Sequence, residues 1–282
     1  MSAENTVYNL NHDWNNEIKR LKIQHDFFRE MAGGKDLPAA VWAHVKELEA
    51  PKIADVGTGT GIWATELAAQ LPETTIIDGY DFDVKKFPDP KTLPKNVTLQ
   101  FGDIFKPFPP EINGKYDVVH VRFLVFALKK DDWLVAVKNL RKLVAPGGFL
   151  FWEETGPYSW ASSPWSEPYY EWVKLESEVG KQLGRDPLAP VQLPSQFKEA
   201  GFTDVEENIF SMLRLSSTTP VDGQPGLLIM AQSLTGLVEN GVLKGKYTKD
   251  DVRKLVERAS EDVRNGTAIN ANFHWTWGCN TV

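Results

Sequence analysis

The chain has 282 residues, a net charge of −7 and an apolar content of 42%. That length can bury a sizeable core, and that composition is typical of a folded protein rather than a disordered one. The acidic balance, without a basic stripe, argues against nucleic acid as a partner. Cys279 is the only cysteine, which excludes an intrachain disulfide and a cysteine-cluster metal site and fits a reducing compartment.

Nothing in the sequence directs the chain to a membrane. The N-terminus lacks a basic segment followed by an apolar one, so we predict no secretory signal. The most apolar stretch, Val118–Leu128, contains His120 and Arg122 and is too short to span a bilayer. We therefore expect a cytoplasmic protein. Its acidic surface with scattered aromatic residues is compatible with a monomer and with a dimer.

Two helices are predicted ahead of the first strand. From Trp14 to Phe28, apolar residues recur at spacings of three and four, which indicates an amphipathic helix ending near Gly33. A second helix covers 35–48 and is broken by Pro51. We interpret residues 1–50 as a helical lid over the site, with simple packing on the domain as the alternative.

The strongest motif is IADVGTGTGIWATELA at residues 53–68. It is typical of a short buried strand, a turn built on Gly57, Gly59 and Gly61, and a helix that leaves the turn. The glycines allow a tight reversal and let a ligand approach bare backbone beside a helix N-terminus. The spacing differs from the dinucleotide fingerprint G-x-G-x-x-G, and it therefore points away from a pyrophosphate ligand.

Strands and helices alternate after this motif. Further strands are predicted at 74–80, 97–101, 115–122 and 149–153, with a helix at 131–144. This order indicates a doubly wound parallel sheet, whose ligands bind outside the carboxyl ends of the strands. Asp81 ends the second strand about 20 residues beyond the glycines, where a carboxylate can accept hydrogen bonds from both hydroxyls of a ribose.

The second half of the chain departs from this rhythm. Residues 155–194 read as an aromatic insertion, which we interpret as a substrate cap. After it we expect a helix at 195–201, a strand at 204–213, helices at 226–239 and 248–265, and a last strand at 268–277. The prediction is a single domain with a lid (1–50), a cofactor-binding core (51–154), the aromatic insertion (155–194) and the completion of the sheet (195–282).

The glycine motif carries a family resemblance. Asp55 followed by Gly57, Gly59 and Gly61 matches the pattern hydrophobic-Asp/Glu-x-G-x-G-x-G, so the chain resembles the class I S-adenosylmethionine-dependent methyltransferases. Pro146-Gly147-Gly148 matches the turn that this family shows before its fifth strand. The resemblance implies a Rossmann-like, seven-stranded, mostly parallel sheet with an antiparallel last strand, and S-adenosyl-L-methionine as the cofactor.

The resemblance also implies which residues contact the cofactor. Asp103 matches the acid that accepts from the adenine amino group, with Ile104 against the ring. The full set of predicted cofactor-binding residues is Asp55, Gly57, Thr58, Gly59, Gly61, Asp81, Phe82, Asp103, Ile104, His120 and Arg122. No spacing of ligand residues indicates a metal, and methyl transfer needs none.

Catalytic and substrate residues are less marked in the sequence. His120, at the exit of the fourth strand, is the candidate general base, with a packed or surface histidine as the alternative. Ten tryptophans suit a flat, apolar small molecule, although each could equally belong to the core. The candidate substrate contacts are Trp14, Phe28, Trp160, Trp165 and Trp172.

A narrower resemblance suggests the acceptor. The stretches NLNHDWNNEIKRLKIQHDFF, ADVGTGTGIWATELA and APGGFLFWEE, between Asn9 and Glu154, resemble fungal methyltransferases of secondary metabolism. Within that group, the chain is most similar to enzymes that S-methylate both thiols of a reduced epidithiodiketopiperazine such as dithiol-gliotoxin. This implies a small-molecule dithiol as the partner. The group also contains O- and N-methyltransferases and a regulator of secondary metabolism, and these remain alternatives.

Overall fold

The computed structural model describes residues 14–211 and 225–282, without the side chains of 14–17 and 225. Its centre is a seven-stranded sheet in the order β3-β2-β1-β4-β5-β9-β7. The first five strands run parallel, and β9 is antiparallel to both β5 and β7, which confirms the predicted fold class. The strands are β1 Lys52–Val56, β2 Ile76–Asp81, β3 Val97–Phe101, β4 Tyr116–Arg122, β5 Val144–Thr155, β7 Thr203–Ser211 and β9 Asn272–Cys279.

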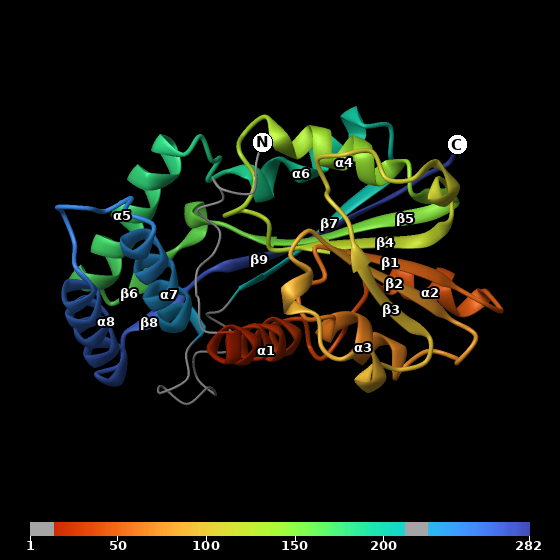
Figure 1. Ribbon diagram of the computed structural model, residues 1–282. Coiled ribbons are helices and arrows are strands. Elements are labelled where there is room, and N and C mark those ends of the chain that lie inside the picture. The colour runs from red at the N-terminus through yellow and green to blue at the C-terminus, as the bar shows by residue number, and fades with distance from the viewer. Residues whose placement is uncertain (1–13, 212–224) are drawn as a thin grey trace.

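Helices cover both faces of this sheet (Figure 1). One face carries α1 Trp14–Met31, α2 Ala39–Glu47 and α3 Ile62–Ala68, and the other carries α4 Asp132–Arg141 and α6 Ala189–Glu199. Successive strand residues point to opposite faces, so Ile53 belongs to one buried cluster and Ala54 to the other. Burial on both faces explains why the strands read as continuous apolar runs.

Two parts of the chain leave the core, the aromatic insertion and the stretch with the helices predicted at 226–239 and 248–265; these two excursions meet in space. α5 Glu167–Gln182, α7 Pro225–Glu239 and α8 Lys249–Arg264 lie together with the short ribbon of β6 Ala161–Ser163 and β8 Ala268–Asn270, at the left of Figure 1. Ser166 Oγ at the start of α5 donates to Asp262 Oδ2 of α8 at 2.7 Å. We call these five elements the cap. They lie beyond the carboxyl ends of the parallel strands, over the region where the sequence predicted the ligand.

Three predicted boundaries were wrong. α6 begins at Ala189 rather than at 195, because the buried side chains of Leu193 and Phe197 hold the helix across Pro194. The predicted last strand is two strands, since β8 pairs with β6 in the cap and β9 pairs with the main sheet. The predicted turn at 146–148 lies inside β5, where the pairing with β4 shifts register.

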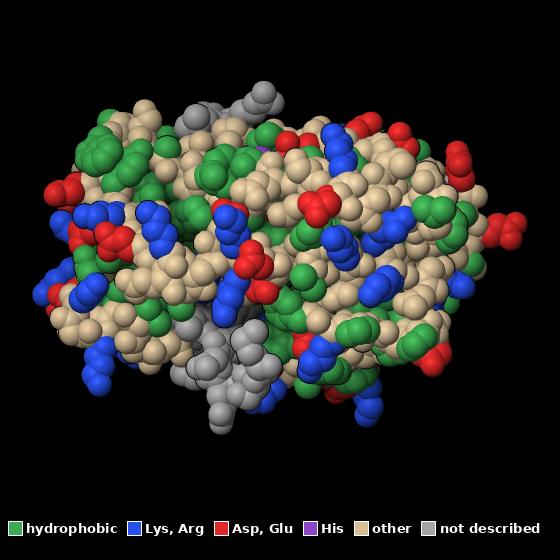
Figure 2. All heavy atoms as spheres, turned by 90° about the horizontal axis from the view of Figure 1, so that it is seen from above, with side chains coloured by type: hydrophobic (Ala, Val, Ile, Leu, Met, Phe, Trp, Pro, Cys, Tyr) green, Lys and Arg blue, Asp and Glu red, His purple; other side chains and the backbone are tan. Residues whose placement is uncertain are grey.

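The face of the molecule in Figure 2 shows Lys and Arg side chains interspersed with Asp and Glu, rather than a stripe of one sign. Within the described ranges, no helix is both long and apolar enough to cross a membrane. The predicted strand residues 212 and 213 lie outside the described residues.

Candidate active site

A cavity of about 980 Å³ lies between the carboxyl ends of the strands, α1 and the cap. At one end it is lined by the glycine turn and the ends of β2 and β4. At the other end it is lined by aromatic residues of the cap and by one face of α7. Two regions that the sequence predicted separately, for cofactor and for substrate, are therefore parts of one continuous space.

The glycine turn forms one end of the cavity, which we call the cofactor end because the sequence predicted the cofactor there. Gly57, Gly59 and Gly61 have φ angles of +74°, +60° and +75°, in the left-handed region that favours glycine. Gly57 and Gly59 line the cavity. Gly61 does not, contrary to prediction, and its role is close packing: a Cβ there would lie 2.9 Å from Leu99 Cδ1.

The N–H groups of this turn are already used within the protein. The N–H groups of Gly57 and Thr58 both donate to the Tyr80 carbonyl oxygen, at 2.7 and 3.0 Å, and that of Gly59 donates to Asp81 Oδ2 at 2.8 Å. A phosphate cradle would need these donors free. The turn therefore offers bare backbone to a ligand, in agreement with the spacing argument against a pyrophosphate.

Asp81 is the acidic group best placed for the cofactor. It is buried and lines the cavity, and its Oδ1 accepts the N–H of Asp83 at 2.9 Å. Each carboxylate oxygen thus holds one backbone donor and keeps a second lone pair. Burial raises the pKa of Asp81 above its usual value. Phe82, 45% exposed, lines the rim beside it.

Asp103 and Ile104 also line the cavity, as the resemblance implied. Asp103 Oδ1 accepts the N–H of Phe105 at 3.0 Å, which fixes the loop after β3. Asn139 of α4 donates to the Ile104 carbonyl oxygen at 3.1 Å and holds the same loop from behind. The assignment of these two residues to the adenine remains a prediction.

Asp55 and His120 form a buried pair that does not reach the cavity, contrary to prediction. They face each other in the β1–β4 register, and His120 Nδ1 donates to Asp55 Oδ1 at 2.8 Å. Thr58 Oγ1 donates to the other oxygen at 2.6 Å, and the imidazole stacks on Trp63. Burial acts to lower the pKa of His120, but the contacts with Asp55 and Glu153 raise it overall.

His120 therefore cannot serve as the general base in this arrangement. Its side chain is 0% exposed and is enclosed between β1, β4, β5 and α3. The sequence placed it correctly at the exit of β4, but that strand alternates faces, and His120 points into the layer below the cavity rather than into it. The pair instead ties Thr58 of the glycine turn to the sheet.

Arg122 and His25 link the first helix to the cavity. Arg122 Nη1 donates to His25 Nδ1 at 3.0 Å, which leaves the proton of the neutral imidazole on Nε2 to donate to Glu66 at 2.9 Å. Burial and the nearby Arg122 charge lower the pKa of His25, which favours this neutral form. Both Arg122 and His25 line the cavity, so these hydrogen bonds hold α1 over it. No motif in the sequence pointed to this role of His25.

His25, Asp26 and Glu66 also place possible metal ligands close together. In the described structure His25 Nδ1 accepts from Arg122, so Nε2 carries the proton and has no lone pair to offer. These three residues therefore do not make a metal site as they stand.

Glu154 shapes the wall between the two ends of the cavity. It accepts the N–H of Leu124 at 2.7 Å and that of Thr155 at 3.1 Å, and burial raises its pKa to about 8. The loop that it holds includes Phe123, whose φ of +55° is unusual for a residue other than glycine. The ring of Phe123 packs on Phe28 and Phe273.

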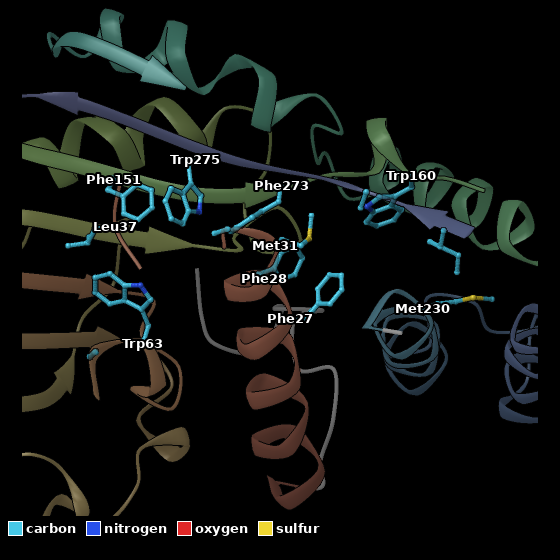
Figure 3. Close-up of a cluster of buried hydrophobic side chains, with 14 of the residues drawn as sticks. Phe27, Phe28, Met31, Leu37, Trp63, Phe151, Trp160, Met230, Phe273 and Trp275 are labelled. Carbon is cyan, nitrogen blue, oxygen red and sulfur yellow. The ribbon is translucent and has the colours of Figure 1, made fainter. Parts of the chain in front are cut away.

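Aromatic side chains line the far end of the cavity. Figure 3 shows Phe28 on α1 pointing toward Phe273, with Trp160 near α7. Of the predicted substrate contacts, Phe28, Trp160 and Trp172 line the cavity, and Trp160 stacks on Trp172 with ring centroids 4.4 Å apart. Trp165 does not line it: its side chain is 69% exposed and stacks on Tyr170. The side chain of Trp14 lies outside the described residues.

The sequence also missed the contribution of α7. Ile229, Gln232 and Ser233 line the aromatic end of the cavity. They belong to no motif, and only the folding of the second excursion against α5 brings them there. Their spacing of i, i+3 and i+4 could have indicated a shared helix face, but not what that face meets.

Comparison of the sequence with known proteins identifies the family. A model of the methyltransferase domain family matches residues 23–207, more than half of the chain. Methyltransferase grgD of a Penicillium species is 38% identical over 239 residues, covering 79% of this chain and 80% of that protein. N-methyltransferase tcpN of Claviceps purpurea is 32% identical over 196 residues, covering 68% of each. Secondary metabolism regulator LAE1 of Gibberella fujikuroi is 26% identical over 280 residues, covering 92% of this chain and 84% of that protein.

The matched segment begins within α1 and ends in β7, so it contains the glycine turn, Asp81 and the whole parallel sheet. The predicted cofactor is confirmed, and the methyl donor is S-adenosylmethionine. The chain belongs to the methyltransferase domain family.

Proposed function

We propose that the protein N-methylates a small, flat metabolite of fungal secondary metabolism, with S-adenosylmethionine as the donor. The observation that carries the proposal is the single cavity joining the glycine turn to the aromatic cap, since donor and acceptor must share one enclosed space. The similarity to a relative named as an N-methyltransferase supports nitrogen as the acceptor.

The residues at the cofactor end fit a nucleoside with an amino-acid tail. Asp81 keeps lone pairs for ribose hydroxyls, the turn at Gly57 and Gly59 lets the ligand approach, and Arg122 supplies a positive charge for a carboxylate. When bound, the cofactor supplies a methyl group on a sulfonium centre. The chain's own task is to bind, orient and exclude water.

The cavity offers no free histidine as a general base among its described lining residues. Its one histidine, His25, is engaged at both ring nitrogens. Its acidic groups each accept a backbone N–H bond, and we assign them to holding the loops of the site and, for Asp81, to the cofactor: Asp81, Asp103, Asp132 and Glu154. A phenol, with a pKa of about 10, would need such a base, whereas a neutral amine nitrogen presents its lone pair without one.

The same reasoning supports a thiol as the second candidate. A thiol ionises with a pKa of about 8.5, so it also reacts without a buried base. This keeps the predicted S-methylation of a dithiol as a proposal beside N-methylation, and it makes O-methylation the least supported of the three chemistries.

Mass spectrometry of products formed with isotopically methyl-labelled cofactor tests the proposal. The acceptor panel would contain an aromatic secondary amine, a reduced dithiol diketopiperazine and a phenol of similar size. We expect label on the amine. Two labelled methyl groups on the dithiol would favour the second candidate. Transfer to the phenol alone would contradict the argument from the missing base, and transfer to none, with cofactor bound, would favour a regulatory role.

A further inference from the structure

One face of α7 presents an unsatisfied polar group at the aromatic end of the cavity. Ile229, Gln232 and Ser233 lie on this face. Ser233 is fully used: its hydroxyl accepts the indole N–H of Trp172 at 3.0 Å and donates to the Met230 carbonyl oxygen at 3.2 Å. Ser233 therefore holds α7 against α5 and has no remaining donor for a ligand.

Gln232 differs from its neighbour. Its amide oxygen is buried and has no hydrogen-bond partner among the described residues. A buried carbonyl-type oxygen left without a donor is costly, and such groups are uncommon in folded proteins. The terminal amide turns about a broad torsion, so rotation about it can direct this oxygen to a ligand in the cavity that the residue lines.

The surroundings of Gln232 limit what the ligand can be. Trp160 and Trp172, stacked on each other, and Ile229 and Ile269 provide an apolar lining for a flat ring. In such a dry environment one acceptor discriminates strongly, because a ligand without a matching donor leaves the oxygen unpaired.

We propose that Gln232 is the specificity-determining residue that selects a flat aromatic substrate bearing a ring N–H, whose hydrogen the carboxamide oxygen accepts. The inference rests on the proposed function, since it assigns this end of the cavity to the substrate. It concerns recognition of the substrate, and the ring N–H need not be the atom that is methylated.

The test compares two probes that differ in the substituent on the ring nitrogen, a hydrogen in one and a methyl group in the other. Indole carries the N–H, and 1-methylindole has nearly the same shape without it. Calorimetry would measure the binding of each to protein saturated with S-adenosylhomocysteine. We expect the wild type to favour indole about tenfold, the effect of one satisfied buried acceptor. Gln232→Met, similar in length but without the acceptor, should lower this preference to near unity.

Gln182→Met provides the matched control. Gln182 also lines the cavity, but it is exposed at the end of α5. This variant should keep the tenfold preference. Gln232→Met should also melt at the same temperature as wild type or higher, because it removes an unsatisfied buried group; a purely structural glutamine would give a lower value.

Equal affinities of the wild type for the two probes, or no measurable binding of either, would overturn the inference. So would a preference for indole that persists in Gln232→Met. The proposed function is tested separately by the labelled-methyl assay. Failure of methyl transfer with the indole preference intact would count against that function alone, and the reverse result would count against Gln232 alone.

Discussion

Asp81→Asn is the sharpest test of the cofactor end of the site. The carboxylate accepts one backbone N–H on each oxygen and keeps one further lone pair on each for the ligand. Asparagine keeps the size but replaces one acceptor by a donor. One bond to the ligand is therefore lost, together with the negative charge.

A hydrogen bond to a charged group contributes about 1.5–3 kcal/mol, so the affinity for S-adenosylhomocysteine should fall by about 10- to 150-fold. The amide nitrogen also faces one of the two backbone N–H donors, from Gly59 or Asp83, which should lower the free energy of unfolding by about 1–3 kcal/mol. Calorimetry gives the first quantity and thermal melting the second.

Asp83→Asn is the matched control, since Asp83 lies two residues further on and does not line the cavity. It should bind the cofactor product nearly as the wild type does. Because burial raises the pKa of Asp81, wild-type binding should also weaken on acidification at a higher pH than an ordinary carboxyl would give. Unchanged affinity in Asp81→Asn would refute the assignment of this carboxylate to the ribose.

Three further predictions concern the supporting residues. Burial raises the pKa of Glu154 to about 8, so the stability it contributes is complete below about pH 4.5 and is lost as pH rises toward 8. The melting temperature of Glu154→Gln should depend less on pH across that range than that of the wild type. Parallel curves of melting temperature against pH for the two proteins would contradict this. His120→Asn should lower stability by about 3–5 kcal/mol by breaking a buried pair, yet leave kcat of the folded enzyme within a few-fold of wild type; a selective loss of kcat would restore its role as base. His25→Ala should make α1 more sensitive to limited proteolysis, whereas Lys22→Ala, which loses only an exposed pair, should not; equal sensitivity would disprove the link.

The sequence by itself determined the sheet and the cofactor. Strands buried on both faces need continuous apolar runs, and the alternate glycines of the turn need a backbone that other residues rarely adopt. These are local requirements, so they are visible in a single stretch of chain. The position of Asp81 was equally readable, because it follows from a strand end at a fixed distance from the turn; its contact with the ribose stays a prediction.

Only the tertiary structure decided which side chains reach the cavity. His120 lies opposite Asp55 because of the pairing of β4 with β1, and Trp165 is exposed while Trp172 is buried although both belong to the same aromatic stretch. Gln232 reaches the cavity because two excursions that are far apart in the sequence fold into one cap. Periodicity reports which residues share a face of an element, whereas the partner of that face depends on long-range packing that no local pattern encodes.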